Sequence, residues 1–165
     1  MTFPSQVNVV PAIGVAGDFA STNPRVSVIN QQGAFVAGVG GVNVGLFAWA
    51  DVTFNRTVLN AGTGAPTGFV AREQQAMIVL YLAENSFNIP AGMAVTLYSA
   101  GDFFVANAGA GAVTIGMKAF ASLTTGAVQF AATGATIAGF IETKWVARTF
   151  AGIGELVKMS SHLLG

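Results

Sequence analysis

The chain has 165 residues, a length that suits one domain and is enough to bury a hydrophobic core. Charged residues make up only 8% of it, against about 25% in ordinary soluble proteins, and seven basic residues balance seven acidic ones. Because basic and acidic residues balance, the chain lacks the excess positive charge that attracts a nucleic-acid backbone or an anionic membrane. Cysteine is absent and histidine occurs once, which argues against disulfides, zinc sites and Ser-His-Asp hydrolases.

Two features bear on cellular location. The N-terminus has no basic region leading into an apolar stretch, so we expect no signal peptide and assign synthesis to the cytoplasm. Residues 26–50 and 119–141 lack charge, but glycine and polar residues interrupt both windows. These interruptions suit turns between strands better than a helix in lipid, so we expect no membrane span.

The first 24 residues have little periodicity and contain Pro4, Pro11 and Pro24. Because proline removes a backbone donor, we expect an extended N-terminal arm over 1–24. From Arg25 the pattern changes, since Val26 and Val28 alternate with polar Ser27. A Gln-Gln-Gly turn then leads into residues 34–37, which predicts a first β-hairpin.

Residues 42–50 and 52–59 are rich in β-branched and aromatic side chains and predict two strands, followed by a loop over 60–66. The stretch 68–85 is ambiguous because helix formers at 72–77 precede strand formers at 78–81. We favour a strand there, and the sequence leaves the choice at 70–84 open.

Turns at 89–92 and 99–102 are expected to delimit two short strands, 93–98 and 103–105. Period-two alternation is clearest over 113–120, where Val113, Ile115, Met117 and Ala119 share one face. A turn at 124–126 leads back through 128–130, and two last strands follow at 143–150 and 155–160.

The total is about nine to eleven strands. We therefore predict an all-β fold, a jelly-roll-like sandwich or barrel, with the arm (1–24) preceding a single β domain (25–165).

No catalytic or cofactor site emerges from the remaining polar residues. His162 lies three residues from the C-terminus and is interpreted as a solvated tail residue. A glycosidase would need acids such as Asp51 and Glu73 brought together, and the acids show no local pairing. We predict no enzyme activity, no metal site and no cofactor.

Two further interpretations remain open. Trp49 and Trp145 are interpreted as core residues, with a sugar-binding face as the alternative. The arginines are either solvated or paired across a subunit boundary; they are Arg25, Arg56, Arg72 and Arg148.

The order of several short segments resembles the structural cement, or head decoration, proteins of tailed bacteriophages over nearly the whole chain. The segments are Phe3-Pro4-Ser5-Gln6-Val7-Asn8-Val9, Gly17-Asp18-Phe19-Ala20, Asn23-Pro24-Arg25, Gly68-Phe69-Val70, Arg72-Glu73-Gln74-Gln75-Ala76, Ile89-Pro90-Ala91-Gly92, Gly101-Asp102-Phe103, Gly116-Met117-Lys118-Ala119-Phe120-Ala121 and Gly154-Glu155-Leu156-Val157-Lys158. Met117 departs from the family pattern, in which a polar residue is expected.

The resemblance implies a homo-oligomeric virion protein, assembled in the host cytoplasm, that binds the major capsid protein on the outer surface of the expanded head. It implies no direct contact with nucleic acid or membrane. A virion-displayed carbohydrate-binding or host-adhesion module is the alternative. An extended apolar arm gains contact area per residue on docking. The expected capsid contacts are therefore Phe3, Pro4, Val7, Val9, Pro11, Phe19 and Arg25.

Overall fold

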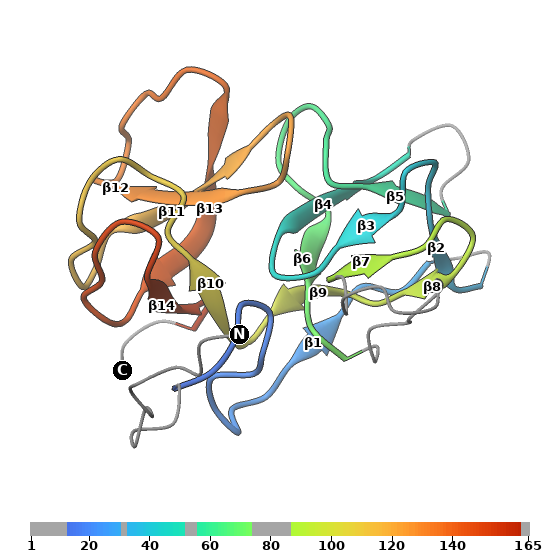
Figure 1. The fold of residues 1–165 in the computed structure, drawn as a ribbon, viewed down its shortest axis with the longest axis horizontal. Helices are drawn as coiled ribbons and strands as arrows, with labels where there is room; N and C mark the ends of the chain where they lie inside the picture. Colours follow the sequence, from blue (N-terminus) through green and yellow to red (C-terminus); the bar gives the residue numbers. More distant parts are fainter. Residues whose placement is uncertain (1–12, 31–32, 52–55, 74–86, 163–165) are drawn as a thin grey trace, which may run out of the picture.

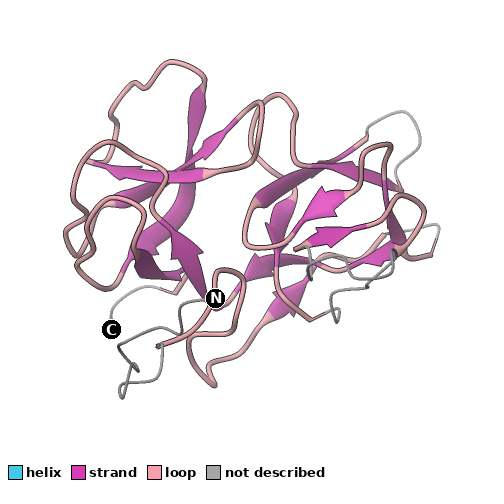
Figure 2. Cartoon of the chain, viewed as in Figure 1, coloured by secondary structure: helices cyan, strands magenta, loops and turns pink. Residues whose placement is uncertain are grey.

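A computed structural model describes residues 13–30, 33–51, 56–73 and 87–162. Within them the chain forms fourteen short β-strands and no helix, so the all-β prediction is confirmed (Figure 2). The strands gather in two groups that meet where β9 passes into β10 (Figure 1). No helix in the described part of the chain is long and apolar enough to cross a membrane.

The first group is a seven-stranded sheet in the order β1-β9-β6-β4-β5-β2-β8. All its pairs are antiparallel except β2 with β5. β8 at one edge and β9 near the other are separated in the chain by Thr96 alone, so the sheet curls round on itself. Its strands are β1 (Val26–Ser27), β2 (Phe35–Ala37), β4 (Phe47–Ala50), β5 (Thr57–Leu59), β6 (Gly68–Val70), β8 (Ala94–Val95) and β9 (Leu97–Ala100).

The second group is a five-stranded antiparallel sheet in the order β10-β14-β13-β11-β12. It curls as well, because Asn107 just after β10 forms a bridge with Val128 of β12 at the opposite edge. Its strands are β10 (Asp102–Ala106), β11 (Lys118–Ser122), β12 (Val128–Ala131), β13 (Phe140–Ala147) and β14 (Leu156–Ser160). A small separate pair is formed by β3 (Val42–Asn43) and β7 (Asn88–Ile89).

Alternating side chains of the first sheet enter two different cores. Phe47, Phe69 and Tyr98 point to a core shared with the second sheet, whereas Ala48, Val70 and Leu97 line a core inside the first sheet. The shared core centres on Trp145, whose ring centroid lies 5.6 Å from that of Phe103 and 6.1 Å from that of Phe47. The aromatic packing is typical of stabilising pairs and joins the two sheets.

Several strand predictions were wrong. β1 pairs with β9 and β2 with β5 and β8, so the expected hairpin of 26–28 with 34–37 does not form. The stretch 42–50 is two strands in different sheets, and the expected turn at 99–102 is a single glycine between β9 and β10. The single face predicted for 113–119 is interrupted, because Met117 N–H donates to the Thr114 carbonyl in a turn that leaves Ile115 48% exposed.

Other expectations agree with the structure. The stretch 68–85 begins as strand β6, and residues 74–86 lie outside the described residues. Turns occur at 90–93 and 123–125, and 128–131, 140–147 and 156–160 are strands.

Candidate functional site

Two of the seven predicted contact residues lie in the described part of the chain, and the structure brings them together. The Arg25 guanidinium carbon lies 3.8 Å from the centroid of the Phe19 ring, a cation–π contact. Phe19 in turn packs against Tyr98 and Phe103, with centroids 5.9 and 5.5 Å away. The other five lie outside the described residues: Phe3, Pro4, Val7, Val9 and Pro11.

The N-terminal segment 13–25, here called the strap, runs across the junction of the two sheets. Its backbone pairs with β10, since Gly17 N–H donates to the Phe104 carbonyl (2.7 Å) and Ala20 N–H to the Asp102 carbonyl (2.9 Å). It also accepts from the first sheet's side, where Arg72 N–H donates to the Gly17 carbonyl (2.8 Å). The strap therefore ties β10 of one sheet to the chain just after β6 of the other.

Gly17 makes this crossing possible. Its φ of 93° lies in the region that side chains disfavour, and a Cβ there would lie 3.0 Å from the Gly45 nitrogen and 3.2 Å from the Arg72 nitrogen. A side chain at this position would therefore combine an unfavourable backbone conformation with tight contacts to two other segments.

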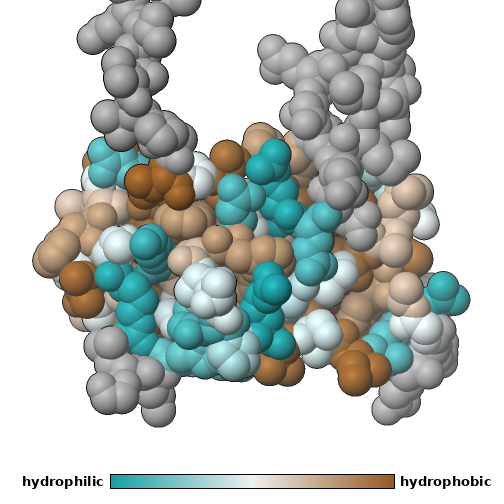
Figure 3. All heavy atoms as spheres, turned by 90° about the horizontal axis from the view of Figure 1, so that it is seen from below, coloured by the Kyte–Doolittle hydropathy of each residue, from teal (hydrophilic) through white to brown (hydrophobic). Residues whose placement is uncertain are grey.

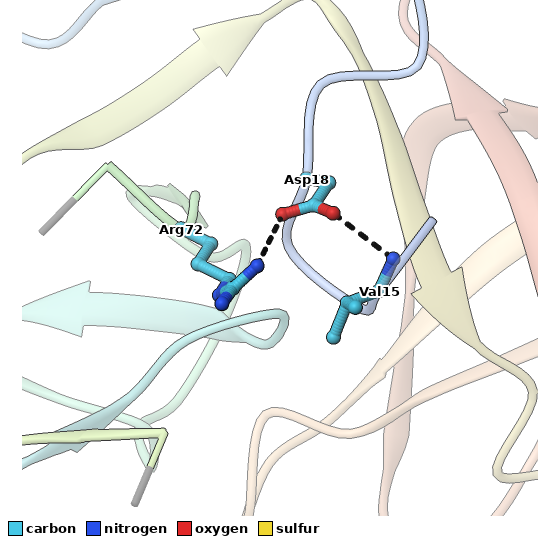
Figure 4. Close-up of polar contacts among 3 residues, drawn as sticks. All are labelled: Val15, Asp18 and Arg72. Atoms are coloured by element: carbon cyan, nitrogen blue, oxygen red, sulfur yellow. Dashed lines mark hydrogen bonds and ion pairs between the residues drawn. The ribbon is translucent and has the colours of Figure 1, made fainter. Parts of the chain in front are cut away.

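Asp18 anchors the first half of the strap (Figure 4). One carboxylate oxygen accepts from Arg72 Nη1 at 3.2 Å, and the other accepts from Val15 N–H at 3.0 Å and closes a local turn. Both side chains of the ion pair are about one-third exposed, so the pair fixes geometry more than it adds stability. Arg72, for which the sequence left open solvation or pairing across a subunit boundary, is instead paired within its own chain.

Asp102 anchors the second half. Its Oδ2 accepts from Ser21 Oγ and from Asn23 Nδ2, each at 2.6 Å. Burial disfavours the charged form of this carboxyl, but the hydroxyls of Ser160 and Ser21, the Asn23 amide and nearby His162 outweigh it and lower its pKa. Asp102 is therefore an ionised acceptor that holds the strap to the start of β10.

His162 lies at the same place, and its expected role as a solvated tail residue is corrected. Its Nε2 lies 3.0 Å from the Pro24 carbonyl, and the Arg148 guanidinium donates to its carbonyl. The C-terminal tail after β14 is thus held against the strap.

Exposed apolar side chains lie in and next to the strap. Ile13, Val26 and Ile29 are 70%, 52% and 89% exposed, and they lie within or just after the strap. A second set of exposed apolar side chains, Ile115, Phe150 and Ile153, lies on turns of the second sheet. Figure 3 shows one face on which hydrophilic and hydrophobic residues are interspersed.

Three residues considered for sugar binding or catalysis take part in the packing or hydrogen bonding of the fold. Trp49 and Trp145 are 7% and 3% exposed, so both are core residues and neither offers a ring face to a sugar. Glu73 accepts a hydrogen bond from the Tyr98 hydroxyl, which, after burial, is a further cause of the raised pKa of Tyr98. Among the described residues no group of three His, Cys, Asp or Glu could hold a metal ion.

The sequence predicted Phe19 and Arg25 as capsid contacts, and it did not single out Asp102, Ser21 or Asn23 as residues that hold the strap. Asp102 was placed at the end of a predicted turn over 99–102. Its partners lie about 80 residues away in the chain, so no local pattern could reveal them.

The described strands form a sandwich-like β fold, and the polar residues described above hold segments of the chain to one another. The chain belongs to the XM1 gp53 minor capsid protein family, which it matches over residues 3–161. A chain from the solved structure "The capsid of Myoviridae Phage XM1" has the same fold, with a TM-score of 0.66 at 16% identity over 98% of each chain. No curated protein matches the sequence. The protein is thus a capsid-associated structural protein of the tailed-phage type, and its place is the virion.

Proposed function

We propose that this minor capsid protein is a decoration, or cement, protein. It binds the outside of the expanded head and stabilises contacts between major capsid protein subunits. It acts as a homo-oligomer, is added to the head after synthesis in the host cytoplasm, and uses no cofactor, catalysis or direct contact with nucleic acid or membrane.

The observation that carries the proposal is the way the strap fixes the root of the N-terminal arm. Residues 13–25 are held by Asp18 and Asp102 at the junction of the sheets, and exposed Ile13 and Ile29 lie beside them. A segment mounted in a fixed place costs less ordering free energy when it docks. The arm residues 1–12 carry no charge, so an interface built on them leaves no charge unpaired.

The contacts fall into two kinds under this proposal. Phe3, Pro4, Val7, Val9 and Pro11 touch the capsid directly. Phe19 and Arg25 hold the root of the arm, because Phe19 packs on Phe103 within its own chain. Many copies on a shell turn modest single contacts into strong overall binding.

Co-sedimentation with bare expanded capsids of the same phage tests the proposal. The truncated protein should begin at Ile13 and not at Arg25, because removing Phe19 would also disturb the core. A full-length variant with Val7→Asp and Val9→Asp tests the same contact without shortening the chain. Val39→Asp is the matched control, since Val39 is 96% exposed on a loop between β2 and β3.

The full-length protein and the Val39→Asp control should bind saturably. The truncation and the double variant should bind at least about tenfold more weakly, as expected when central contacts are lost. Unchanged binding of both would place the contact on the β body and contradict the role of the arm. Absence of binding by the full-length protein would contradict the decoration function itself.

A further inference from the structure

The two halves of the strap are held by different carboxylates at different places. Asp18 ties residues 15–18 to Arg72, next to the first sheet. Asp102 ties residues 21–23 to the start of β10 in the second sheet. The two attachments share no side chain, so one can be lost while the other remains.

The second half depends on a single charged group for its side-chain bonds. Ser21 and Asn23 both donate to the same oxygen of Asp102, and Ser21 Oγ also accepts from Asn23 N–H at 3.0 Å. The other carboxylate oxygen, Oδ1, is buried with no hydrogen-bond partner in its present geometry, although Ser160 lies opposite Asp102 in the β10–β14 pair. Hydrogen bonds to an ionised acceptor are about twice as strong as bonds to a neutral one. The negative charge of Asp102 therefore contributes more to holding Ser21 and Asn23 than the size of its side chain does.

Little else holds this half in place. Residues 21–25 are exposed to solvent, and beyond Asp102 their contacts are the Pro24 carbonyl with His162 and the Arg25 cation over Phe19. The packing that joins the sheets is made elsewhere, by Phe47, Phe69, Phe103 and Trp145. Release of residues 21–25 therefore leaves the shared core intact.

We propose that Asp102 fastens the second half of the strap: neutralising this one side chain frees residues 21–25 from the body while the two sheets stay joined. His162 on the C-terminal tail also acts electrostatically on Asp102, and the Arg148 guanidinium donates to the His162 carbonyl. The inference concerns the free protein and does not depend on the proposed capsid contact.

Spin labelling of the full-length protein tests whether Asp102 holds the second half of the strap. The chain has no cysteine, so Thr22→Cys gives one attachment point on the exposed part of the strap. The label is followed by electron paramagnetic resonance in the otherwise natural chain, with Asp102→Asn, and with Ser21→Ala plus Asn23→Ala. Asp18→Asn is the matched control, because it removes the carboxylate that anchors the first half of the strap. Near-ultraviolet circular dichroism reports the aromatic core in every variant.

Asp102→Asn and the double variant should raise the ratio of mobile to immobile label about tenfold or more at neutral pH, as loss of a charge-assisted bond implies. The Asp18→Asn control should leave the label restricted, and the aromatic signal should persist in all variants. A label that stays restricted in both test variants would overturn the proposal. So would a label that becomes mobile only together with loss of the aromatic signal, since strap and sheets would then open as one unit.

Discussion

Gly126 shows how a single backbone position joins the two sheets. It follows the turn between β11 and β12, has a φ of 70°, and accepts a hydrogen bond from Phe47 N–H of β4 at 2.9 Å. A Cβ at this position would lie 2.1 Å from the Phe47 carbonyl oxygen, which is backbone and cannot swing aside. The contact therefore requires glycine for both its conformation and its lack of a side chain.

Gly126→Ala should lower the free energy of unfolding by at least about 2 kcal/mol, because strain in the left-handed region adds to the clash with β4. Gly134→Ala is the matched control. Its φ of 77° is similar but a Cβ there meets nothing within 4 Å, so it should cost about 1 kcal/mol. Urea denaturation measures both unfolding free energies. An equal loss in the two variants would show that the close approach of Gly126 to Phe47 adds nothing to the cost of a side chain.

Asp102 also predicts a dependence of stability on pH. Its pKa in the folded protein lies below the ordinary value of 3.8, so the folded state favours the charged form. The stabilisation is fully present above the ordinary pKa and is lost as pH falls through the lower folded value. The difference in unfolding free energy between the natural chain and Asp102→Asn should therefore be constant from neutral pH to about pH 5 and shrink below about pH 4. A difference that stays unchanged well below about pH 4 would contradict this assignment.

At the scale of elements, local patterns identified strands better than they identified strand partners. The segments at 128–131 and 156–160 were predicted nearly to the residue, because alternating side chains and flanking glycines are local signals. Val26 and Phe35 were assigned to one hairpin, yet β1 pairs with Ala100 and Tyr98 of β9. Val95 and Leu97, which flank Thr96 before β9, are buried in the core inside the first sheet, and this long-range packing is not visible in a local sequence pattern.

The strap shows the same limit for the candidate site. Prolines at 4, 11 and 24 predicted an extended arm over 1–24; its described part, residues 13–24, contains no strand, and Phe19 forms an isolated bridge with Phe103. The sequence could not reveal that this segment bridges two sheets, because its partners Arg72 and Asp102 lie 54 to 81 residues further on. Asp18 and Asp102 became recognisable only when the fold placed donors around them.

For the whole molecule, the shared core predicts that both sheets unfold together. The segment 94–106 supplies β8, β9 and β10 in succession and so belongs to both sheets, and Trp145 packs on Phe47, Phe69 and Phe103 from both. Tryptophan fluorescence and far-ultraviolet circular dichroism should report coincident urea transitions with one midpoint. Two separated midpoints would show that the sheets are independent folding units.

The pairing of β1 with β9 has a consequence for synthesis. Val26 leaves the ribosome long before its partner Ala100, which at typical translation rates means a wait of roughly 4 to 15 seconds. During that interval the nascent chain exposes apolar segments with few charges to keep neighbouring chains apart. A host cell making many copies at once would therefore have to shield these chains, and chaperone capacity would limit the yield of folded protein before any capsid is reached.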